Sequence, residues 1–257
     1  MRIVTWNVNS IRARRERALA WVTQHQPDVI ALQELKTTDE AFPTDDFAAL
    51  GYHAVTWGQK TYNGVALLSR TQPTDVVRGF DDGVDDPQAR FIAATFEGVR
   101  VCCGYFPNGG EPDSDKYQYK RAWLGRLDAW LDDHASADEA LVLCGDFNIA
   151  PDASDVCNVN AWEGTVLFNP EMRAAFRGLL DWGLTDSFRL QDDHDVVFSW
   201  WDYRRLAFVR NQGLRIDHLL VTEPLVARVE RVWVDRAERK GESPSDHAPV
   251  VLDMRWP

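Results

Sequence analysis

The residues best suited to chemistry in this sequence are Asp146 and Asn148, which follow a short apolar run. The run Leu141–Cys144 has the length and composition of a strand buried on both faces, and Gly145 permits a bend or a close ligand approach. In an extended chain, residues two apart point to the same side, so the carboxylate and the amide would face one ligand. Open α/β sheets bind ligands at such strand ends. The alternative is a simple turn, because Asp and Asn favour loops by bonding the local backbone.

Four further stretches end in the same way, which favours a site over an isolated turn. The polar side chains collected at predicted strand ends are Asn7, Asn9, Glu34, Tyr105, Asp146, Asn148, Asp217, Asp246 and His247. Singly the carboxylates could be solvated caps, but together they would repel one another unless a cation or a proton lies between them. Oxygen ligands without a cysteine–histidine cluster suit Mg²⁺, which takes one or two protein carboxylates, waters and substrate phosphate. The pattern therefore predicts a magnesium site.

The elements that must position these side chains alternate between strands and helices. A strand over residues 2–6, a helix and a buried strand over 29–32 give the β-α-β pattern of a layered α/β protein. Turns at Asn63-Gly64 and Gly98 predict antiparallel neighbours, so the sheets should be mixed. Helices are expected after the caps at 113–115 and from Asn169-Pro170 to Gly183, with an irregular excursion over 151–164. No linker or repeat divides the chain, which predicts one domain over residues 1–257.

Bulk composition bounds the class of protein. Apolar content of 45% and charged content of 26% are ordinary for a globular protein, and no segment has the length of a membrane span or the core of a signal peptide. The four cysteines lack metal-site spacing, which favours reduced thiols and a cytoplasmic location. A net charge of −12 argues against a protein that binds nucleic acid through its overall charge. A metal ion and a few arginines could still bind one phosphodiester locally.

The sequence resembles the exonuclease III type of apurinic/apyrimidinic endonuclease, within the endonuclease/exonuclease/phosphatase superfamily. Eight segments carry the resemblance in the family's order: Trp6–Asn9, Leu32–Lys36, Gly58–Lys60, Gly64–Leu68, Gly104–Pro107, Gly145–Asn148, Gly213–Asp217 and Ser245–Pro249. The resemblance implies a four-layer α/β sandwich, in which two packed mixed β-sheets are flanked by helices. Leu35 stands where many relatives carry threonine, a change expected to be harmless, and variation over 108–115 bears on the balance of exonuclease and endonuclease activity.

The resemblance also implies roles for the strand-end residues. Asn7, Glu34 and Asp246 would form the metal side of the site, for Mg²⁺ or, in its place, Mn²⁺. The catalytic set implied is Asp146 to orient or deprotonate water, Asn148 to hold water and phosphate, Tyr105 and His247 to contact phosphate oxygens, and Asp217 to fix the histidine. The other five histidines are assigned no role, and His218 is expected to face away from Asp217 if that segment is a strand.

Contacts to DNA are predicted at a second set of residues: Asn9, Arg90, Lys116, Lys120, Trp200 and Arg204. The resemblance places Trp200 in the wall of a pocket for an extruded abasic sugar, whereas adjacent tryptophans are more often core and rim. The cationic side chains could reach flanking phosphates, as could Arg205 and Arg210. For each of them, a charge that only faces solvent and contacts no DNA is an equal alternative.

These observations predict a Mg²⁺-dependent DNA repair nuclease, acting as a monomer on duplex DNA. It would cut 5′ to abasic sites and clear nucleotides or blocking groups from 3′ ends. A phosphatase for inositol phosphates or lipids is one alternative, but it would need basic specificity loops in place of the turn at Trp200–Arg205. A catalytically inactive DNA-binding relative is another, and the presence of Glu34, Asp146 and His247 together argues against it.

Overall fold

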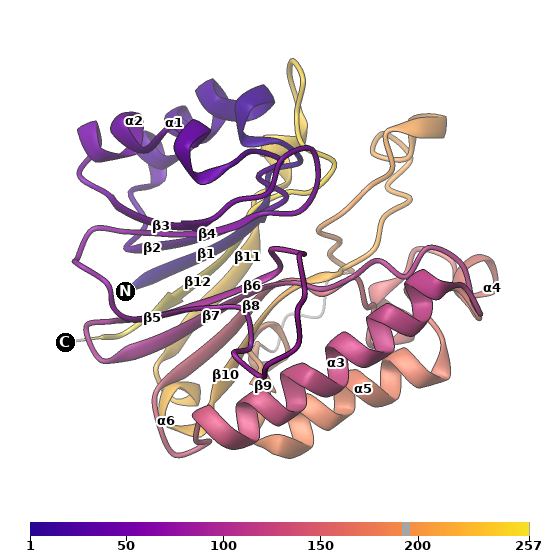
Figure 1. The fold of residues 1–257 in the computed structure, drawn as a ribbon. Coiled ribbons are helices and arrows are strands. Elements are labelled where there is room, and N and C mark those ends of the chain that lie inside the picture. Colours follow the sequence, from indigo (N-terminus) through magenta and orange to yellow (C-terminus); the bar gives the residue numbers. More distant parts are fainter. Residues whose placement is uncertain (192–195, 257) are drawn as a thin grey trace.

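Two six-stranded sheets pack face to face in the computed structural model, which describes residues 1–191 and 196–256 (Figure 1). The first sheet has the order β11-β12-β1-β2-β4-β3, with bounds Val229–Val234, Val250–Met254, Arg2–Asn7, Val29–Gln33, Val65–Ser69 and His53–Trp57. The second has the order β5-β6-β7-β8-β10-β9, with bounds Thr74–Arg78, Phe91–Phe96, Val99–Tyr105, Leu141–Asp146, Asp217–Thr222 and Leu184–Asp186. Only β1/β2 and β7/β8 pair in parallel among these strands, so both sheets are mixed, as predicted.

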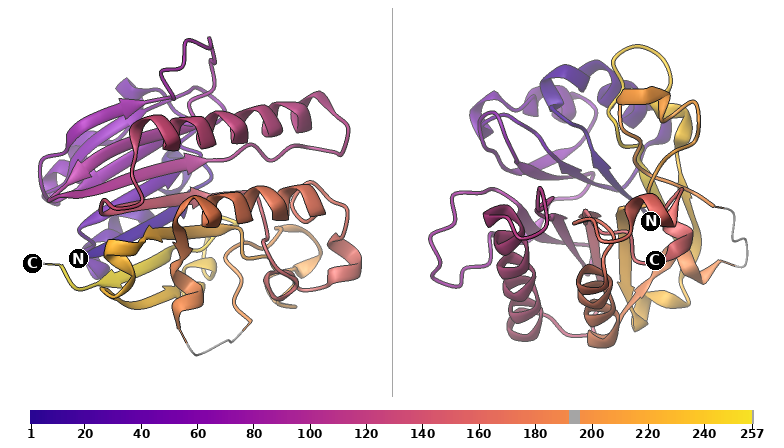
Figure 2. Two further views of the ribbon diagram at one scale, coloured as in Figure 1. Left: turned by 90° about the horizontal axis from the view of Figure 1, so that it is seen from below. Right: turned by 90° about the vertical axis from the view of Figure 1, so that its right-hand side faces the viewer.

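Helices cover the outer faces of both sheets, which completes the four layers predicted from the sequence. The helices α1 (Ile11–His25) and α2 (Thr44–Ala49) lie on the first sheet, and α3 (Asp115–His134) and α5 (Pro170–Trp182) lie on the second (Figures 1 and 2). Two shorter helices are α4 (Val159–Trp162) and α6 (Glu223–Val226). Side-chain alternation explains the layering: in β1, Ile3 packs between the sheets and Val4 packs beneath the helices. None of the described helices is long and apolar enough to cross a membrane.

The helix boundaries follow the local chemistry of the sequence. The side chain of Ser114 accepts a hydrogen bond from the backbone of Tyr117 and begins α3. Asn169 does the same for α5, Pro170 occupies its first turn, and Gly183 ends it with a φ of 124°. These ends agree with the predicted caps. Between the two helices, the predicted irregular segment contains only a short 3₁₀ turn and α4.

The role expected of Gly145 needs a correction. The strand does not bend there but continues to Asp146, and the glycine is required by its neighbour β7. A Cβ atom at Gly145 would lie 1.8 Å from the carbonyl oxygen of Gly104, so only glycine lets the two parallel strands approach this closely. This contact fixes the ends of β7 and β8 side by side.

Candidate active site

The predicted strand-end residues converge at one end of the two sheets, opposite the end where both termini lie (Figure 1). Asn7 ends β1, Tyr105 ends β7 and Asp146 ends β8, and Asp217 begins the antiparallel β10 at the same level. Strand register explains the meeting, since Tyr105 and Asp217 are both partners of Asp146. Distant segments are therefore brought together by sheet pairing rather than by loop packing.

Asn7 joins the two sheets across the site. Its Nδ2 donates to Oε1 of Glu34 at 2.8 Å and to Oδ2 of Asp146 at 2.9 Å. Its Oδ1 accepts from the backbone N–H of Asn9 at 3.0 Å, which orients the amide nitrogen toward the carboxylates. The hydroxyl of Tyr105 also donates to Oε1 of Glu34, at 2.9 Å, and burial raises the pKa of this phenol, so it remains a donor. Glu34 and Asp146 therefore face the same space.

His247 is held by the carboxylate of Asp217. The ring Nδ1 lies 2.8 Å from Oδ2 of Asp217, and Ser199 donates its hydroxyl to the same oxygen at 2.6 Å. Burial alone would lower the pKa of His247, but the charges of Asp217 and Asp146 raise it to about 10. The imidazole is therefore a cation at neutral pH and carries a proton on both nitrogens. Its Nε2 lies 3.6 Å from Oδ2 of Asp146 and points into the site.

Asp146 is a deeply buried carboxylate, with 1% of its surface exposed. Burial raises the pKa of Asp146 to about 7, and the cationic His247 and the amide of Asn7 oppose that rise. A carboxylate whose pKa lies near neutral pH can exchange a proton with water under physiological conditions. This property suits a general base.

Asn148 faces Asp146, but not for the reason expected from the sequence. The chain leaves the extended conformation after Asp146, and Asn148 adopts a left-handed φ of 50°. In that conformation its backbone N–H donates to Oδ1 of Asp146 at 3.0 Å and its Nδ2 lies 3.2 Å from Oδ2. The side chain of Asn108, which was given no role from the sequence, donates to Oδ1 of Asn148 at 2.9 Å.

A group of residues that could hold a metal ion forms within the described part of the chain. Ligand atoms of Glu34, Asp146 and His247 all lie within 4.8 Å of one another. The carboxylate oxygens fit a hard divalent cation, and a cationic imidazole is not a ligand in that state. Lys36 offers its ammonium to Oε2 of Glu34 at 2.8 Å. Lys36 was given no role from the sequence. It stands two residues after Glu34 within the segment Leu32–Lys36, and this proximity could have predicted that it pairs with Glu34.

Asp246 lies next to this group and has partners of its own. Its two carboxylate oxygens accept from Nδ2 of Asn9 at 2.9 Å and from the indole N–H of Trp200 at 3.0 Å. Although burial opposes it, His247 and these donors keep the pKa of Asp246 below its ordinary value. The structure thus places Asp246 beside Asn9 and Trp200, outside the group formed by Glu34, Asp146 and His247.

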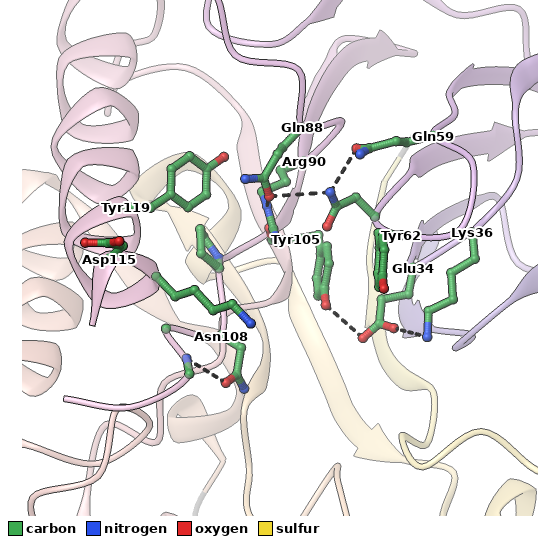
Figure 3. Close-up of a pocket in the computed structure, with 15 residues that line it drawn as sticks. Glu34, Lys36, Gln59, Tyr62, Gln88, Arg90, Tyr105, Asn108, Asp115 and Tyr119 are labelled. Carbon is green, nitrogen blue, oxygen red and sulfur yellow. Dashed lines mark hydrogen bonds and ion pairs between the residues drawn. The ribbon is translucent and has the colours of Figure 1, made fainter. Parts of the chain in front are cut away.

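A cavity of about 740 Å³ opens beside Glu34 and Tyr105 (Figure 3). Arg90 and Lys116 both line it, as predicted residues near the substrate would. The guanidinium of Arg90 stacks over the ring of Tyr105 at 4.6 Å and donates to its carbonyl oxygen. Arg204 lies elsewhere, on the exposed segment after Trp200, where it pairs with Asp202 at 3.0 Å.

Lys120 requires a correction, because its side chain does not reach the surface. It is 0% exposed, and its ammonium donates to the carbonyl oxygens of Asn148 at 2.7 Å and Val166 at 2.8 Å. Burial lowers the pKa of Lys120 to about 7. The predicted contact with a flanking phosphate is therefore inconsistent with its position, whereas Lys116, one turn earlier, is exposed.

The structure places the other described histidines outside the group formed by Glu34, Asp146 and His247. His218 is buried and faces away from Asp217, toward Phe147 and Phe176. His53 is exposed at the start of β3, and His25 and His134 end α1 and α3. His194 lies outside the described residues.

Comparison with known proteins identifies relatives over the whole chain. Exodeoxyribonuclease III of Haemophilus influenzae is 39% identical over 99% of this chain and 100% of its own length. Exodeoxyribonuclease of Bacillus subtilis is 33% identical over 98% of both chains. These relatives are nucleases by name.

Solved structures match at the level of the fold as well. A 3′ phosphatase from Neisseria, solved bound to a product DNA hairpin, has a TM-score of 0.96 and 42% identity over 100% of both chains. An AP endonuclease from Archaeoglobus fulgidus has a TM-score of 0.96 and 36% identity over the same full coverage. The profile of the endonuclease/exonuclease/phosphatase family matches residues 4–247. With strand ends, site geometry and relatives in agreement, the chain belongs to the endonuclease/exonuclease/phosphatase family.

Proposed function

We propose that this protein is a Mg²⁺-dependent DNA repair nuclease that hydrolyses the phosphodiester 5′ to an abasic site. We extend the proposal to 3′ ends of duplex DNA, from which it would remove nucleotides and blocking groups. The observation that carries the proposal is the buried carboxylate of Asp146, which lies 3.6 Å from the cationic His247 and is bonded by Asn7. The relatives named exodeoxyribonuclease III and AP endonuclease support the choice of DNA as substrate.

In this mechanism Asp146 takes the proton of the attacking water. Its pKa of about 7 leaves it largely ionised at mildly alkaline pH and still basic enough to accept a proton. The amides of Asn7 and Asn148 donate to the carboxylate and fix its direction. Asp146 is thereby positioned to align water with the phosphorus atom.

His247 stabilises the charge that develops on the phosphate. Its Nδ1 proton is engaged by Asp217, which leaves the Nε2 proton free to bond a phosphate oxygen in the site. The hydroxyl of Tyr105, which its raised pKa keeps protonated, donates to Glu34 and would contact a phosphate oxygen by exchanging that bond. The amide of Asn148 donates to Asp146 and to the carbonyl oxygen of Phe106 and would likewise exchange a bond to contact the phosphate.

The residue that would hold the metal ion is Glu34, whose carboxylate oxygens match the preference of Mg²⁺ and lie within 4.8 Å of the base Asp146. When bound, Mg²⁺ supplies neutralising charge for the phosphate and the departing 3′ oxygen. Asn7, predicted as a metal-site residue, faces these carboxylates with its amide nitrogen, so in this mechanism it would orient Glu34 rather than bind the metal itself. Asp246 would act through Asn9 and Trp200. Mn²⁺ should substitute for Mg²⁺ because it accepts the same ligands.

Trp200 supports the preference for an abasic site. Its ring lies 6.5 Å from that of His247, so an apolar wall borders the phosphate donors. A sugar without a base is cheap to extrude from the duplex, and such a wall would favour it over an intact nucleotide. The free thiols of Cys102, Cys103 and Cys144, which are buried, support a reducing compartment such as the cytoplasm.

The proposal is tested with three substrates in Mg²⁺, with and without EDTA. These are a duplex with one tetrahydrofuran abasic analogue, a nicked duplex with a 3′ phosphate, and an inositol phosphate. We expect EDTA-sensitive cutting 5′ to the analogue and release of the 3′ phosphate. The Asp146→Asn variant is the control for contaminating nuclease. Hydrolysis of the inositol phosphate alone, or of no substrate, would refute the proposal.

A further inference from the structure

Two buried side chains bind consecutive carbonyl groups of the loop that carries Asn148. Lys120, from α3, donates to the carbonyl oxygen of Asn148 at 2.7 Å. His218, from β10, lies with Nε2 2.9 Å from the carbonyl oxygen of Ile149. Lys120 is 0% exposed and His218 is 1% exposed. The loop is therefore held from the helical layer and from the sheet at once.

Lys120 connects three segments around the site. Its ammonium has three donors, and three carbonyl oxygens accept from it: those of Asn148, Val166 at 2.8 Å and Asn108 at 3.3 Å. Two of these residues also meet through their side chains, since Asn108 donates to Oδ1 of Asn148. A buried amino group satisfied in this way requires that its carbonyl partners stay in place, because a lost partner would leave a buried donor without an acceptor.

The tautomer of His218 follows from its neighbours. Nη1 of Arg215 lies 3.0 Å from Nδ1 of His218, and a guanidinium can only donate, so Nδ1 is the acceptor. The single ring proton is then on Nε2, where it is donated to Ile149. Arg215 is itself fixed by paired bonds to Asp155 and Asp186. The direction of the bond to Ile149 is thus determined by a buried ion cluster.

The backbone conformation of Asn148 is the feature that these contacts hold. Its φ of 50° lies in the left-handed region, which asparagine enters more readily than most residues with a Cβ atom but which the chain adopts only at single positions. Its amide must nevertheless remain near the carboxylate of Asp146, from which it is separated by 3.2 Å. A displacement of about 1 Å in a catalytic group can cost about 10²-fold in rate.

We propose that Lys120 and His218 are positioning residues, which hold Asn148 in its left-handed conformation through the carbonyl groups of residues 148 and 149 and so place its amide against Asp146. The claim that these residues affect the cleavage rate rests on the proposed function. The claim that they hold the loop in place does not depend on any activity.

The first test compares Lys120→Met and His218→Leu with a matched control, Leu127→Ala. Leu127 is 0% exposed and lies on α3 seven residues after Lys120, about 10 Å further along the helix. We expect the single-turnover rate on the abasic duplex to fall about 10–10²-fold in the first two variants. DNA affinity should stay within about twofold, because neither side chain is at the surface. Leu127→Ala should keep its rate while losing stability.

Rescue separates positioning from general stability. The variant His218→Gln retains one donor for Ile149 and one acceptor for Arg215, whereas His218→Leu has neither. We expect His218→Gln to recover most of the lost rate. All rates are measured at a urea-determined native fraction above about 95%, so that unfolded protein does not contribute.

Amide hydrogen exchange tests the loop without any substrate. In Lys120→Met and His218→Leu, we expect exchange in a peptide covering residues 146–151 to accelerate about tenfold or more, relative to the same peptide in Leu127→Ala. Unchanged exchange would overturn the proposal whether or not the protein is a nuclease. Equal rate losses in Leu127→Ala, or no recovery in His218→Gln, would also overturn it. Accelerated exchange in Lys120→Met and His218→Leu, together with a wild-type protein that cuts no DNA, would instead reject the proposed function and leave the loop support established.

Discussion

Two buried histidines on opposite sides of β10 have opposite charge states. His247 contacts Asp217 at the start of the strand, and the carboxylates around it raise its pKa to about 10. His218, the next residue after Asp217, faces α5 instead. Burial and the guanidinium of Arg215 lower the pKa of His218 to about 4. Equal burial thus gives a cation in one place and a neutral ring in the other, because the neighbouring charges differ in sign.

The same contrast holds for the clusters to which the two histidines belong. Beneath α5, the carboxylates of Asp155 and Asp186 are matched by the guanidinium groups of Arg215 and Arg189. At the strand ends the pairing is incomplete: Lys36 pairs with Glu34 and His247 pairs with Asp217, each at 2.8 Å, whereas the hydrogen bonds to Asp146 and Asp246 come from neutral donors. The first cluster is complete without a ligand and serves the fold. The second contains carboxylates without a cation in hydrogen-bond contact, which a divalent cation would help to balance and which is a property of a functional site.

The largest expected effect comes from neutralising the carboxylate that the site leaves uncompensated. In Asp146→Asn the amide cannot accept a proton from water, and we expect cleavage of the abasic duplex to slow about 10²–10⁴-fold. Binding of uncut DNA in Ca²⁺ should remain, since the shape of the site is kept. Single-turnover kinetics measure the change, and an undiminished rate would remove Asp146 from the mechanism.

Removing the partner of His247 should make the two histidines more alike. In Asp217→Asn the largest favourable charge is lost, and we expect the rate to fall roughly 10²-fold because a buried imidazolium loses its pair. The pKa of His247 should also drop toward the ordinary value of about 6.5.

The pH profile provides the readout for that change. In the wild type, activity should rise as Asp146 loses its proton near a pKa of about 7 and fall as His247 loses its own near a pKa of about 10. In Asp217→Asn the alkaline limb should move to lower pH, and the acid limb should also move to lower pH because the charge of Asp217 helps to raise the pKa of Asp146. An alkaline limb that stays in place would show that His247 does not set it.

Below neutral pH, protonation of His218, which lies beneath α5, should lower the free energy of unfolding. His218 is neutral in the folded protein with a pKa of about 4, whereas in the unfolded chain its pKa is near the ordinary 6.5. The unfolded state therefore binds more protons between these values, so stability is complete above pH 6.5 and declines as the pH falls toward 4. We expect a loss of about 2–3 kcal/mol across this window.

The variant His218→Gln isolates this contribution, because glutamine keeps the hydrogen bonds but does not titrate. Urea unfolding at a series of pH values gives the free energy of unfolding for both proteins. The two curves should diverge as the pH falls, with the wild type losing more. Parallel curves would mean that His218 is not the group that titrates.

The active-site residues were predictable because hydrophobic pattern and strand pairing dominate their placement. Glu34, Asp146 and Asp217 each follow or begin an apolar run, and strands of a layered sheet end together. The left-handed backbone of Asn148 was not predictable in this way. It depends on contacts with Asn108 and Lys120 that come from other elements, and periodicity carries no information about such contacts.

The burial of Lys120 could have been predicted from its helical spacing, but its charge led to the opposite prediction. Its distance from Lys116 suggested a shared basic face, but it also lies three residues from both Tyr117 and Trp123, which are buried on the inner face of α3. The helical period therefore placed Lys120 on the apolar face, and its charge obscured this. Polarity predicts exposure only when the chain offers no buried partners, and here three carbonyl groups are available.

The smallest effect concerns two exposed arginines, one at each end of the molecule. Arg204 pairs with Asp202 near the site with 85% of its side chain exposed, and Arg255 pairs with Glu230 at the opposite end with 71% exposed. Exposed pairs of this kind contribute little to stability, so both alanine variants should unfold like the wild type. If Arg204 contacts a DNA phosphate, Arg204→Ala should weaken DNA binding about two- to threefold and reduce the slope of log affinity against log salt by about one. Arg255→Ala should change neither quantity. Equal slopes for the two variants would place Arg204, like Arg255, among charges that only face solvent.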